Sequence, residues 1–258
     1  MKNTKIQKPI GFYELCSVIE EICQKAEIYK RIKPPHMVVE LDAGCGRTTC
    51  TQYIADMYRK YGVLPFTSGL DDFLEVKLDG SSPQKIQDGF AVFSSAAVYE
   101  NDYSGIAALD ITDMANYLNS TQLNEFLNRI AHLCDTAVCV FFVSSHPSPK
   151  EGQLIGKLLA RIDRVKRISY EALCVEDSCR LLEEVMGEYG VAIEHHQFCF
   201  STLSQVVEEY KIDNAKDVKA FASELLHYAD YSRHTPTIDE KSLSRLVEAN
   251  YQNRERVE

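Results

Sequence analysis

The 258-residue sequence has no apolar run that approaches the roughly eighteen residues needed to cross a membrane. Its first residues, MKNTKIQK, are polar and lack the apolar core of a secretory signal. It also contains no internal repeat and no low-complexity segment, and its 45% hydrophobic content argues against extended disorder. We therefore expect a globular cytoplasmic protein with no membrane segment.

Zinc-knuckle spacing and basic stripes are absent as well. The pairs Cys134/Cys139 and Cys174/Cys179 are too widely spaced for a C-x-x-C knuckle, and no H-x-x-x-H partner accompanies them, so zinc is not expected. The nine cysteines are an odd number, and several lie in apolar or helix-like runs, which favours reduced core thiols. The net charge of −10, with no sustained basic stripe, weighs against a duplex-binding surface. Nucleic acid is therefore not an expected partner.

Strands and helices alternate along most of the chain. Buried or alternating apolar patterns predict strands over 37–41, 73–78, 105–111, 136–143 and 165–169. Helical spacing predicts helices over 12–32, 48–61, 82–100, 120–133, 151–161 and 175–190. Such alternation implies an α/β fold with a mostly parallel sheet and helices on both faces.

The pattern changes after Phe200. Helical periodicity recurs over 201–211, 214–229 and 238–250, and no further strand is predicted. A domain boundary near residue 195 follows, with an α/β domain over 1–195 and a helical domain over 196–258.

A glycine turn follows the first predicted strand, in the sequence LDAGCGRT, and a helix follows the turn. A phosphate-binding loop is built in this way, because glycines allow backbone N–H groups to approach a phosphate at the positive end of a helix. In the pattern G-x-x-x-x-G-K-[ST], Gly46 takes the second glycine, Arg47 the lysine and Thr48 the magnesium-binding hydroxyl, whereas Leu41 replaces the first glycine. Arginine is a planar fork rather than a compact point charge, so we expect weakened nucleotide binding.

The same letters permit two other interpretations. LDAGCGRT also resembles the first motif of methyltransferases that use S-adenosylmethionine, in which Asp42 would be the acid before the glycines. Alternatively, Gly44 and Gly46 only turn a strand into a helix in some α/β protein. The motif alone leaves all three interpretations open.

Five further segments follow the loop in a recognisable order: 71–90, 103–115, 140–148, 157–170 and 213–223. With these segments, the chain from about residue 10 to residue 250 resembles AAA+ ATPases, more narrowly the Rubisco-activase and sporulation stage V branch, which have an α/β nucleotide domain followed by a small helical lid. In that resemblance the segments correspond, in order, to the strand and helix facing the pore, Walker B, sensor 1, the arginine-finger segment and sensor 2.

The resemblance implies a P-loop fold and a set of site residues. Nucleotide contacts are implied for Gly44, Cys45, Gly46, Arg47, Thr48, Thr49, His146 and Lys216. Magnesium would be held by Thr48 and Asp110, and the catalytic candidates are Asp110, Asp113 and Arg161. Each has a structural alternative: Asp110 and Asp113 as turn or helix caps, His146 as part of a proline turn, and Arg161 and Lys216 as surface cations.

One position departs from the family in a way that bears on catalysis. Ile111 stands where the family carries the glutamate that orients the attacking water, and isoleucine cannot direct a proton. Asp113 could reach the water instead. We therefore expect a degenerate AAA+ protein that binds ATP or ADP with Mg²⁺, hydrolyses slowly or not at all, and assembles with itself or with an intact AAA+ partner on an unknown client.

Overall fold

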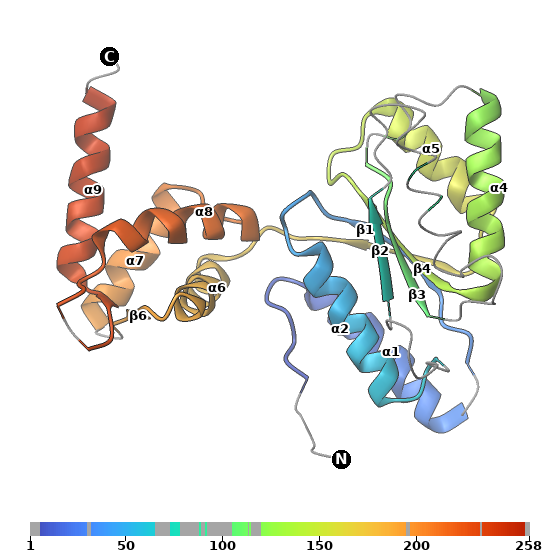
Figure 1. Cartoon of the computed structure of the whole chain (residues 1–258), viewed down its shortest axis with the longest axis horizontal. Coiled ribbons are helices and arrows are strands. Elements are labelled where there is room, and N and C mark those ends of the chain that lie inside the picture. The colour runs from blue at the N-terminus through green and yellow to red at the C-terminus, as the bar shows by residue number, and fades with distance from the viewer. Residues whose placement is uncertain are drawn as a thin grey trace. The chain divides into compact units, whose positions relative to one another are not determined.

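The chain divides into two compact units, Met1–Tyr170 and Glu171–Glu258. Figure 1 shows both units in a computed structural model. The structure describes residues 6–29, 32–64, 73–77, 88, 91, 105–112, 114, 120–194, 197–232 and 234–255. In this part of the chain, no helix is long and apolar enough to cross a membrane.

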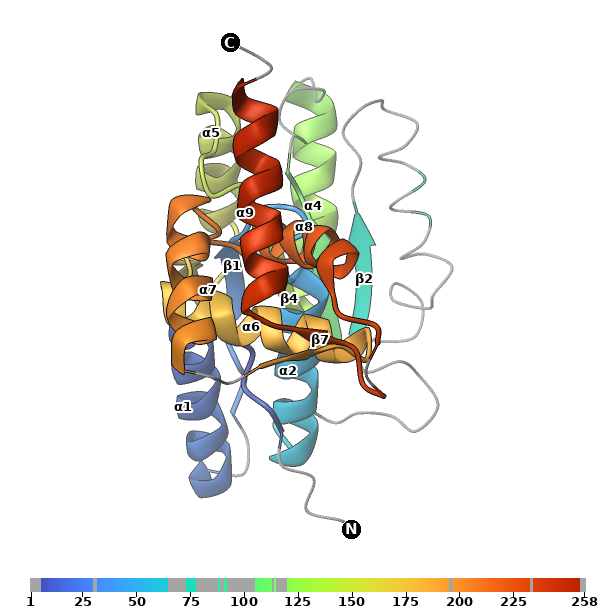
Figure 2. The same ribbon diagram turned by 90° about the vertical axis from the view of Figure 1, so that its left-hand side faces the viewer.

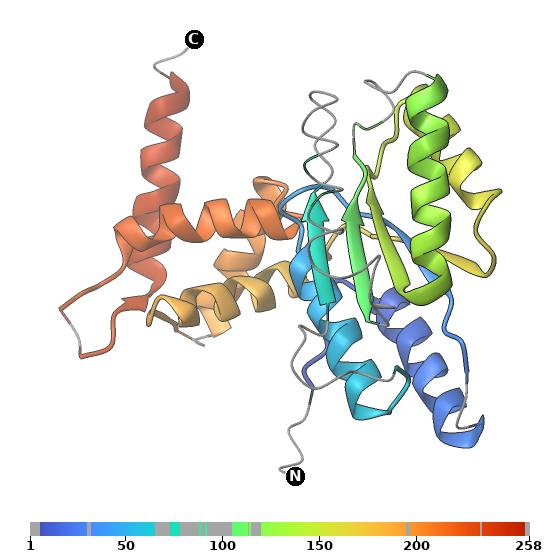
Figure 3. The same ribbon diagram turned by 45° about the vertical axis from the view of Figure 1, so that its right-hand side comes forward.

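A five-stranded parallel sheet organises the described part of the first unit. Its strands are β1 (His36–Glu40), β2 (Phe73–Lys77), β3 (Ile106–Asp110), β4 (Val138–Val143) and β5 (Val165–Ser169). They lie in the order β2-β3-β4-β1-β5, and every neighbouring pair is parallel. Because the strands are parallel, their carboxyl ends meet at one edge of the sheet, which Figure 3 shows from the side.

Helices cover both faces of this sheet. One face packs against α1 (Tyr13–Tyr29) and α2 (Arg47–Lys60), and the other against α4 (Ser120–Thr136) and α5 (Pro149–Leu159). Successive strand residues point to opposite faces. Met37 and Val39 therefore pack in the hydrophobic cluster with α1 and α2, whereas Val38 packs in the cluster with α4 and α5. Both faces are therefore apolar, which explains the continuous hydrophobic runs of the central strands.

The second unit is mainly helical. Its helices are α6 (Val175–Glu188), α7 (Gln197–Glu209), α8 (Ala215–Leu225), the 3₁₀ turn η2 (Leu226–Tyr228) and α9 (Glu240–Glu255). Figure 2 views this unit from the front. A short parallel pair joins β6 (Ala192–Ile193) to β7 (Thr237–Ile238). Asn214 caps α8, because its side-chain oxygen accepts a hydrogen bond from the N–H of Asp217.

The parallel sheet with flanking helices is confirmed, and two details differ from the sequence predictions. The units divide after Tyr170 rather than at residue 195, because α6 packs against α7 and α8, and the Ser178 hydroxyl donates to the Ile212 carbonyl at 2.7 Å. A strand does follow Phe200, since β7 pairs with β6. Two paired residues are too few to produce a periodic signal. The helix predicted over 82–100 lies, except for residues 88 and 91, outside the described residues.

Candidate functional site

The loop between β1 and α2 has the left-handed backbone that its glycines allow. Gly44 has φ of 87° and Gly46 has φ of 97°, a region that residues with a Cβ rarely adopt. Gly46 is the N-cap of α2, and no side chain there bonds to the first turn of the helix. A Cβ at Gly46 would also lie 3.4 Å from the ring of Phe12. The loop therefore offers the first-turn N–H groups of α2 to an acceptor such as a phosphate.

Arg47, the first residue of α2, points back into its own unit. Its Nε and Nη2 donate to the Leu41 carbonyl at 2.9 and 2.6 Å, and Nη1 forms an ion pair with Asp110. Nη2 also donates to the Thr112 hydroxyl at 3.1 Å, and the guanidinium lies 5.6 Å from the centre of the Phe142 ring. The Arg47 and Asp110 side chains are only 12% and 14% exposed. We call the contacts of Arg47 with Leu41, Asp110 and Thr112 the Arg47 latch.

The oxygen atoms predicted to hold magnesium already have partners within the protein. Asp110 accepts from Arg47 through one oxygen, and from the backbone N–H and hydroxyl of Thr112 through the other. The Thr48 hydroxyl donates to Glu75 of β2 at 3.0 Å. These are the hard oxygen donors that Mg²⁺ prefers, but the ion would have to compete with the guanidinium for Asp110. As arranged, the pair does not fit Mg²⁺.

Asp42 ties the loop to the neighbouring strand β4. It accepts hydrogen bonds from the Ser145 hydroxyl at 2.6 Å, the Ser145 N–H at 3.1 Å and the Ser144 hydroxyl at 3.2 Å. These bonds, led by the Ser145 hydroxyl, together with the charge of Arg47, hold the pKa of Asp42 below its usual value. This structural role was missed from the sequence, where the only signals were an acid before the glycines and two serines after a buried strand.

Three other predicted contacts of the nucleotide lie at the same edge of the sheet. Cys45 is buried within the loop, and Thr49 is exposed on the first turn of α2. His146 is exposed after the end of β4, and its backbone N–H donates to the Ser144 hydroxyl at 3.2 Å. The structure therefore brings the loop and the sensor 1 segment together, since β1 and β4 are neighbours.

The other predicted site residues are Arg161, Lys216 and Asp113. Arg161 is exposed and donates to the side chain of Asn124 on α4 at 3.0 Å. Lys216 is exposed on the first turn of α8, in the second unit. Asp113 lies outside the described residues. The roles assigned to these three side chains stay predictions.

Ile111 is part of the hydrophobic core. It is 2% exposed, packs in the cluster beneath α4 and α5, and donates its backbone N–H to the Phe142 carbonyl at 3.0 Å. A side chain at this position points away from water. The position that the sequence resemblance assigns to the water-orienting glutamate is thus both apolar and buried in this chain.

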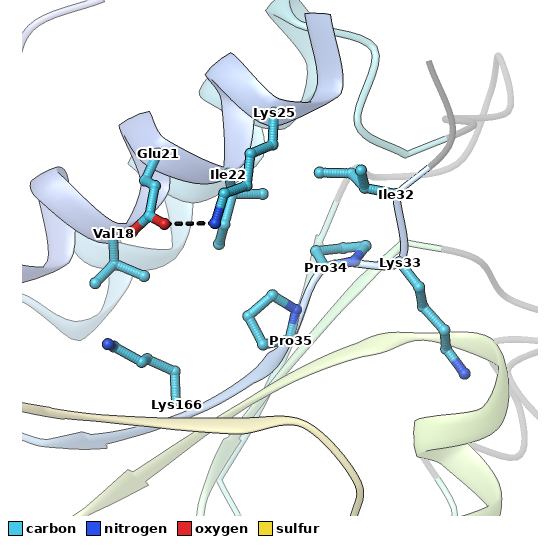
Figure 4. Close-up of a pocket in the computed structure, with 9 residues that line it drawn as sticks. All are labelled: Val18, Glu21, Ile22, Lys25, Ile32, Lys33, Pro34, Pro35 and Lys166. Carbon is cyan, nitrogen blue, oxygen red and sulfur yellow. Dashed lines mark hydrogen bonds and ion pairs between the residues drawn. The ribbon is translucent and has the colours of Figure 1, made fainter. Parts of the chain in front are cut away.

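A pocket of about 360 Å³ lies at the opposite end of β1 and is shown in Figure 4. Its walls are Val18, Glu21, Ile22, Lys25, Ile32, Lys33, Pro34, Pro35 and Lys166. Lys25 is paired with Glu21, and the side chains of Lys33 and Lys166 extend in different directions. Because the charged groups do not converge, the pocket lacks the focused polar contacts typical of a small-molecule site.

No protein-family model and no curated protein sequence matches the chain. Several solved structures, in contrast, match the chain. RuvB of Thermotoga maritima, described as a Holliday junction branch migration motor, matches with a TM-score of 0.61 and 12% identity, covering 93% of this chain and 70% of RuvB. Domain III of the replication initiation protein DnaA from the same organism matches with a TM-score of 0.53 and 13% identity, covering 95% of this chain and 94% of that domain. PCH-2 of C. elegans matches with a TM-score of 0.54 and 11% identity, covering 93% of this chain and 68% of PCH-2. These neighbours are AAA+ ATPases, so the chain has the AAA+ fold.

Proposed function

We propose that this chain, given its AAA+ fold, is a degenerate P-loop module that binds ATP or ADP, hydrolyses slowly or not at all, and acts by nucleotide-gated association with itself or with an intact AAA+ partner. The observation that carries the proposal is the Arg47 latch. The cation at the Walker lysine position is bound to the Walker B carboxylate, and both are largely buried.

The latch removes two features that phosphoryl transfer needs. A cation must stabilise the charge that develops on the phosphates, and the carboxylate must be free to support the metal. In this chain Arg47 and Asp110 neutralise each other. Ile111 supplies no group to orient water. The paired Arg47 and Asp110, together with the apolar Ile111, therefore lead us to expect slow or absent hydrolysis.

Nucleotide binding would compete with the latch. A phosphate at the first turn of α2 would attract the guanidinium of Arg47 away from Asp110, since both acceptors are anionic and the arginine has a long flexible stem. Magnesium enters the proposal only as a rival of Arg47 for Asp110. The protein would thus have two states: a closed latch, in which Arg47 is paired with Asp110, and an open latch, in which Arg47 contacts the phosphate. Nucleotide would favour the open state, and association with a partner would depend on that state.

The strand order supports this interpretation over the methyltransferase alternative. In that alternative, an acid after the second strand grips the ribose of the cofactor. Here β2 is separated from β1 by β3 and β4. At about 4.8 Å between neighbouring strands, the ends of β1 and β2 lie roughly 14 Å apart. The strands beside β1 and its loop are β4 and β5, so an acid at the end of β2 would lie too far away to bind a ribose held at this loop.

Thermal unfolding of the full chain with ATP, ADP and S-adenosylmethionine, each with and without Mg²⁺, tests the proposal. A nucleotide at about a hundred times its Kd should add about 2.7 kcal/mol of stability, whereas S-adenosylmethionine should add none. Arg47→Lys should increase the Mg²⁺-dependent part of the shift, because lysine cannot reproduce the forked contact with Leu41. Arg167→Lys, on exposed β5, is the matched control and should leave the shift unchanged.

A stabilisation by S-adenosylmethionine alone would overturn the assignment, and so would the absence of any nucleotide shift in both wild type and Arg47→Lys. Steady-state ATP hydrolysis should be near background. Robust turnover that is lost with Asp110→Asn or Asp113→Asn would contradict the inactive-module proposal. Sedimentation with and without ADP would report whether the association state follows the nucleotide.

A further inference from the structure

A second group of reactive side chains lies at the amino-terminal edge of the sheet, away from the latch. It consists of His36 at the start of β1, Cys134 in the last turn of α4 and Cys139 in β4. One imidazole nitrogen of His36 and the two sulfur atoms all lie within 4.8 Å of one another, and all three residues are buried. Sequence spacing gave no sign of the group, because Cys139 lies 103 positions after His36. The pairing of β1 with β4 brings them together.

The hydrogen bond at His36 decides what this group can do. The backbone N–H of Cys139 donates to Nδ1 of His36 at 3.0 Å, so Nδ1 carries a lone pair and the neutral ring carries its proton on Nε2. A metal on Nε2 would require the proton to move to Nδ1 and would leave the Cys139 N–H buried without its acceptor. Two thiols and an imidazole suit a soft metal, but this geometry favours chemistry between the sulfurs.

The two thiols are electrostatically unequal. A hydrogen bond from Cys139, supported by one from His36, lowers the pKa of the Cys134 thiol, although burial and Asp135 oppose the shift. Burial and the neighbouring Cys134 raise the pKa of Cys139. Cys134 is therefore the thiol that loses its proton more readily to give the nucleophilic thiolate. It is also the more accessible of the two, at 6% exposed against 0% for Cys139.

We propose that Cys134 and Cys139 form a reversible dithiol–disulfide pair that responds to peroxides, with Cys134 as nucleophile, Cys139 as resolving thiol and His36 as a positioning residue. The Cys134 thiolate attacks a peroxide, ROOH: the S–O bond forms, the O–O bond breaks, and the leaving alkoxide takes a proton to give ROH. Cys139 then attacks the sulfenic sulfur: the S–S bond forms, the S–O bond breaks, and water leaves with the Cys139 proton. The two thiols lose two electrons, which the peroxide gains.

The rest of the chain provides matched comparisons. Cys179 is fully buried, burial raises the pKa of its thiol, and its sulfur lies 3.8 Å from the Ser204 hydroxyl. Cys174 is exposed and could form intermolecular disulfides, so the experiment uses the full chain with Cys174→Ser. Cys179→Ser in that background is the control for the loss of a buried thiol.

The test is limited treatment with hydrogen peroxide, followed by alkylation of the remaining thiols and mass mapping. We expect a Cys134–Cys139 disulfide that dithiothreitol reverses, formed at least about tenfold faster than any oxidation of Cys179. Cys139→Ser should leave a sulfenic acid on Cys134 that dimedone traps, and Cys134→Ser should protect Cys139. His36→Gln should slow the trapping step in the Cys139→Ser chain. Circular dichroism establishes that each variant folds.

Equal oxidation rates at Cys134 and Cys179 would overturn the proposal, as would a disulfide between other cysteines. The metal content of the purified chain is the second measurement. Stoichiometric zinc or copper that protects both thiols until it is chelated would show a metal centre and refute the dithiol pair. This measurement needs none of the cysteine or histidine variants, so it decides the question even if one of them fails to fold.

Discussion

The Arg47 latch makes a quantitative prediction for Arg47→Ala. The substitution removes the ion pair with Asp110, both contacts with the Leu41 carbonyl and the bond to Thr112. Removing one partner of a fully buried pair costs about 3–5 kcal/mol, because the other charge is left uncompensated. Asp110 is 14% exposed and keeps its bonds from Thr112, so we expect a loss of about 2–4 kcal/mol in the free energy of unfolding.

The assay is urea unfolding, with hydrogen exchange of the β1 and β3 amides to separate the first unit from the second. In a parallel thermal melt, 1 kcal/mol corresponds to about 2–4 °C for a unit of this size, so a loss of about 2–4 kcal/mol should lower the transition temperature by about 4–16 °C. Arg167→Ala is the control: its side chain is 55% exposed, against 12% for Arg47, although its partner Glu40 is 14% exposed like Asp110. Because water screens the charge of Arg167, we expect this variant to lose about 1 kcal/mol.

A double-mutant cycle with Asp110→Asn tests the pairing itself. Once Asp110 has lost its charge, removal of Arg47 should cost less, giving a coupling energy of about 1–3 kcal/mol. If Arg47→Ala costs no more than Arg167→Ala, or if the coupling is near zero, Arg47 does not hold Asp110 and the reasoning fails.

Three further predictions follow from individual side chains. Because the pKa of Asp42 is lowered, its stabilisation is complete above the ordinary value of 3.8 and is lost as the pH falls through the lowered pKa. Wild type should therefore exceed Asp42→Asn in urea midpoint at neutral pH, and the two should converge in acid. Ile111→Glu places a carboxylate in the core and should cost at least about 3 kcal/mol without creating ATPase activity, whereas Ile111→Val should cost about 1 kcal/mol in urea unfolding. Asn214→Ala should cost about 1 kcal/mol through loss of the α8 cap, measured by exchange of the α8 amides, and Asn214→Ser should retain most of the cap.

Local sequence patterns determined the elements of this protein. The apolar runs of β1, β3 and β4 predicted buried strands, and the helical spacing predicted most of the helices to within a few residues. The left-handed glycines of the loop were also predictable, because Gly44 and Gly46 stand between a strand and a helix. Each of these features depends on residues close together in the chain.

The tertiary structure decided which side chains meet. The ion pair of Arg47 with Asp110, the bonds from Ser145 to Asp42, and the grouping of His36 with Cys139 each join residues more than sixty positions apart. They arise because β4 lies between β1 and β3. The packing of all the elements together sets this order, and no local periodicity encodes it. The sequence could therefore locate the candidate loop, but only the fold could show that its arginine is bound to the carboxylate.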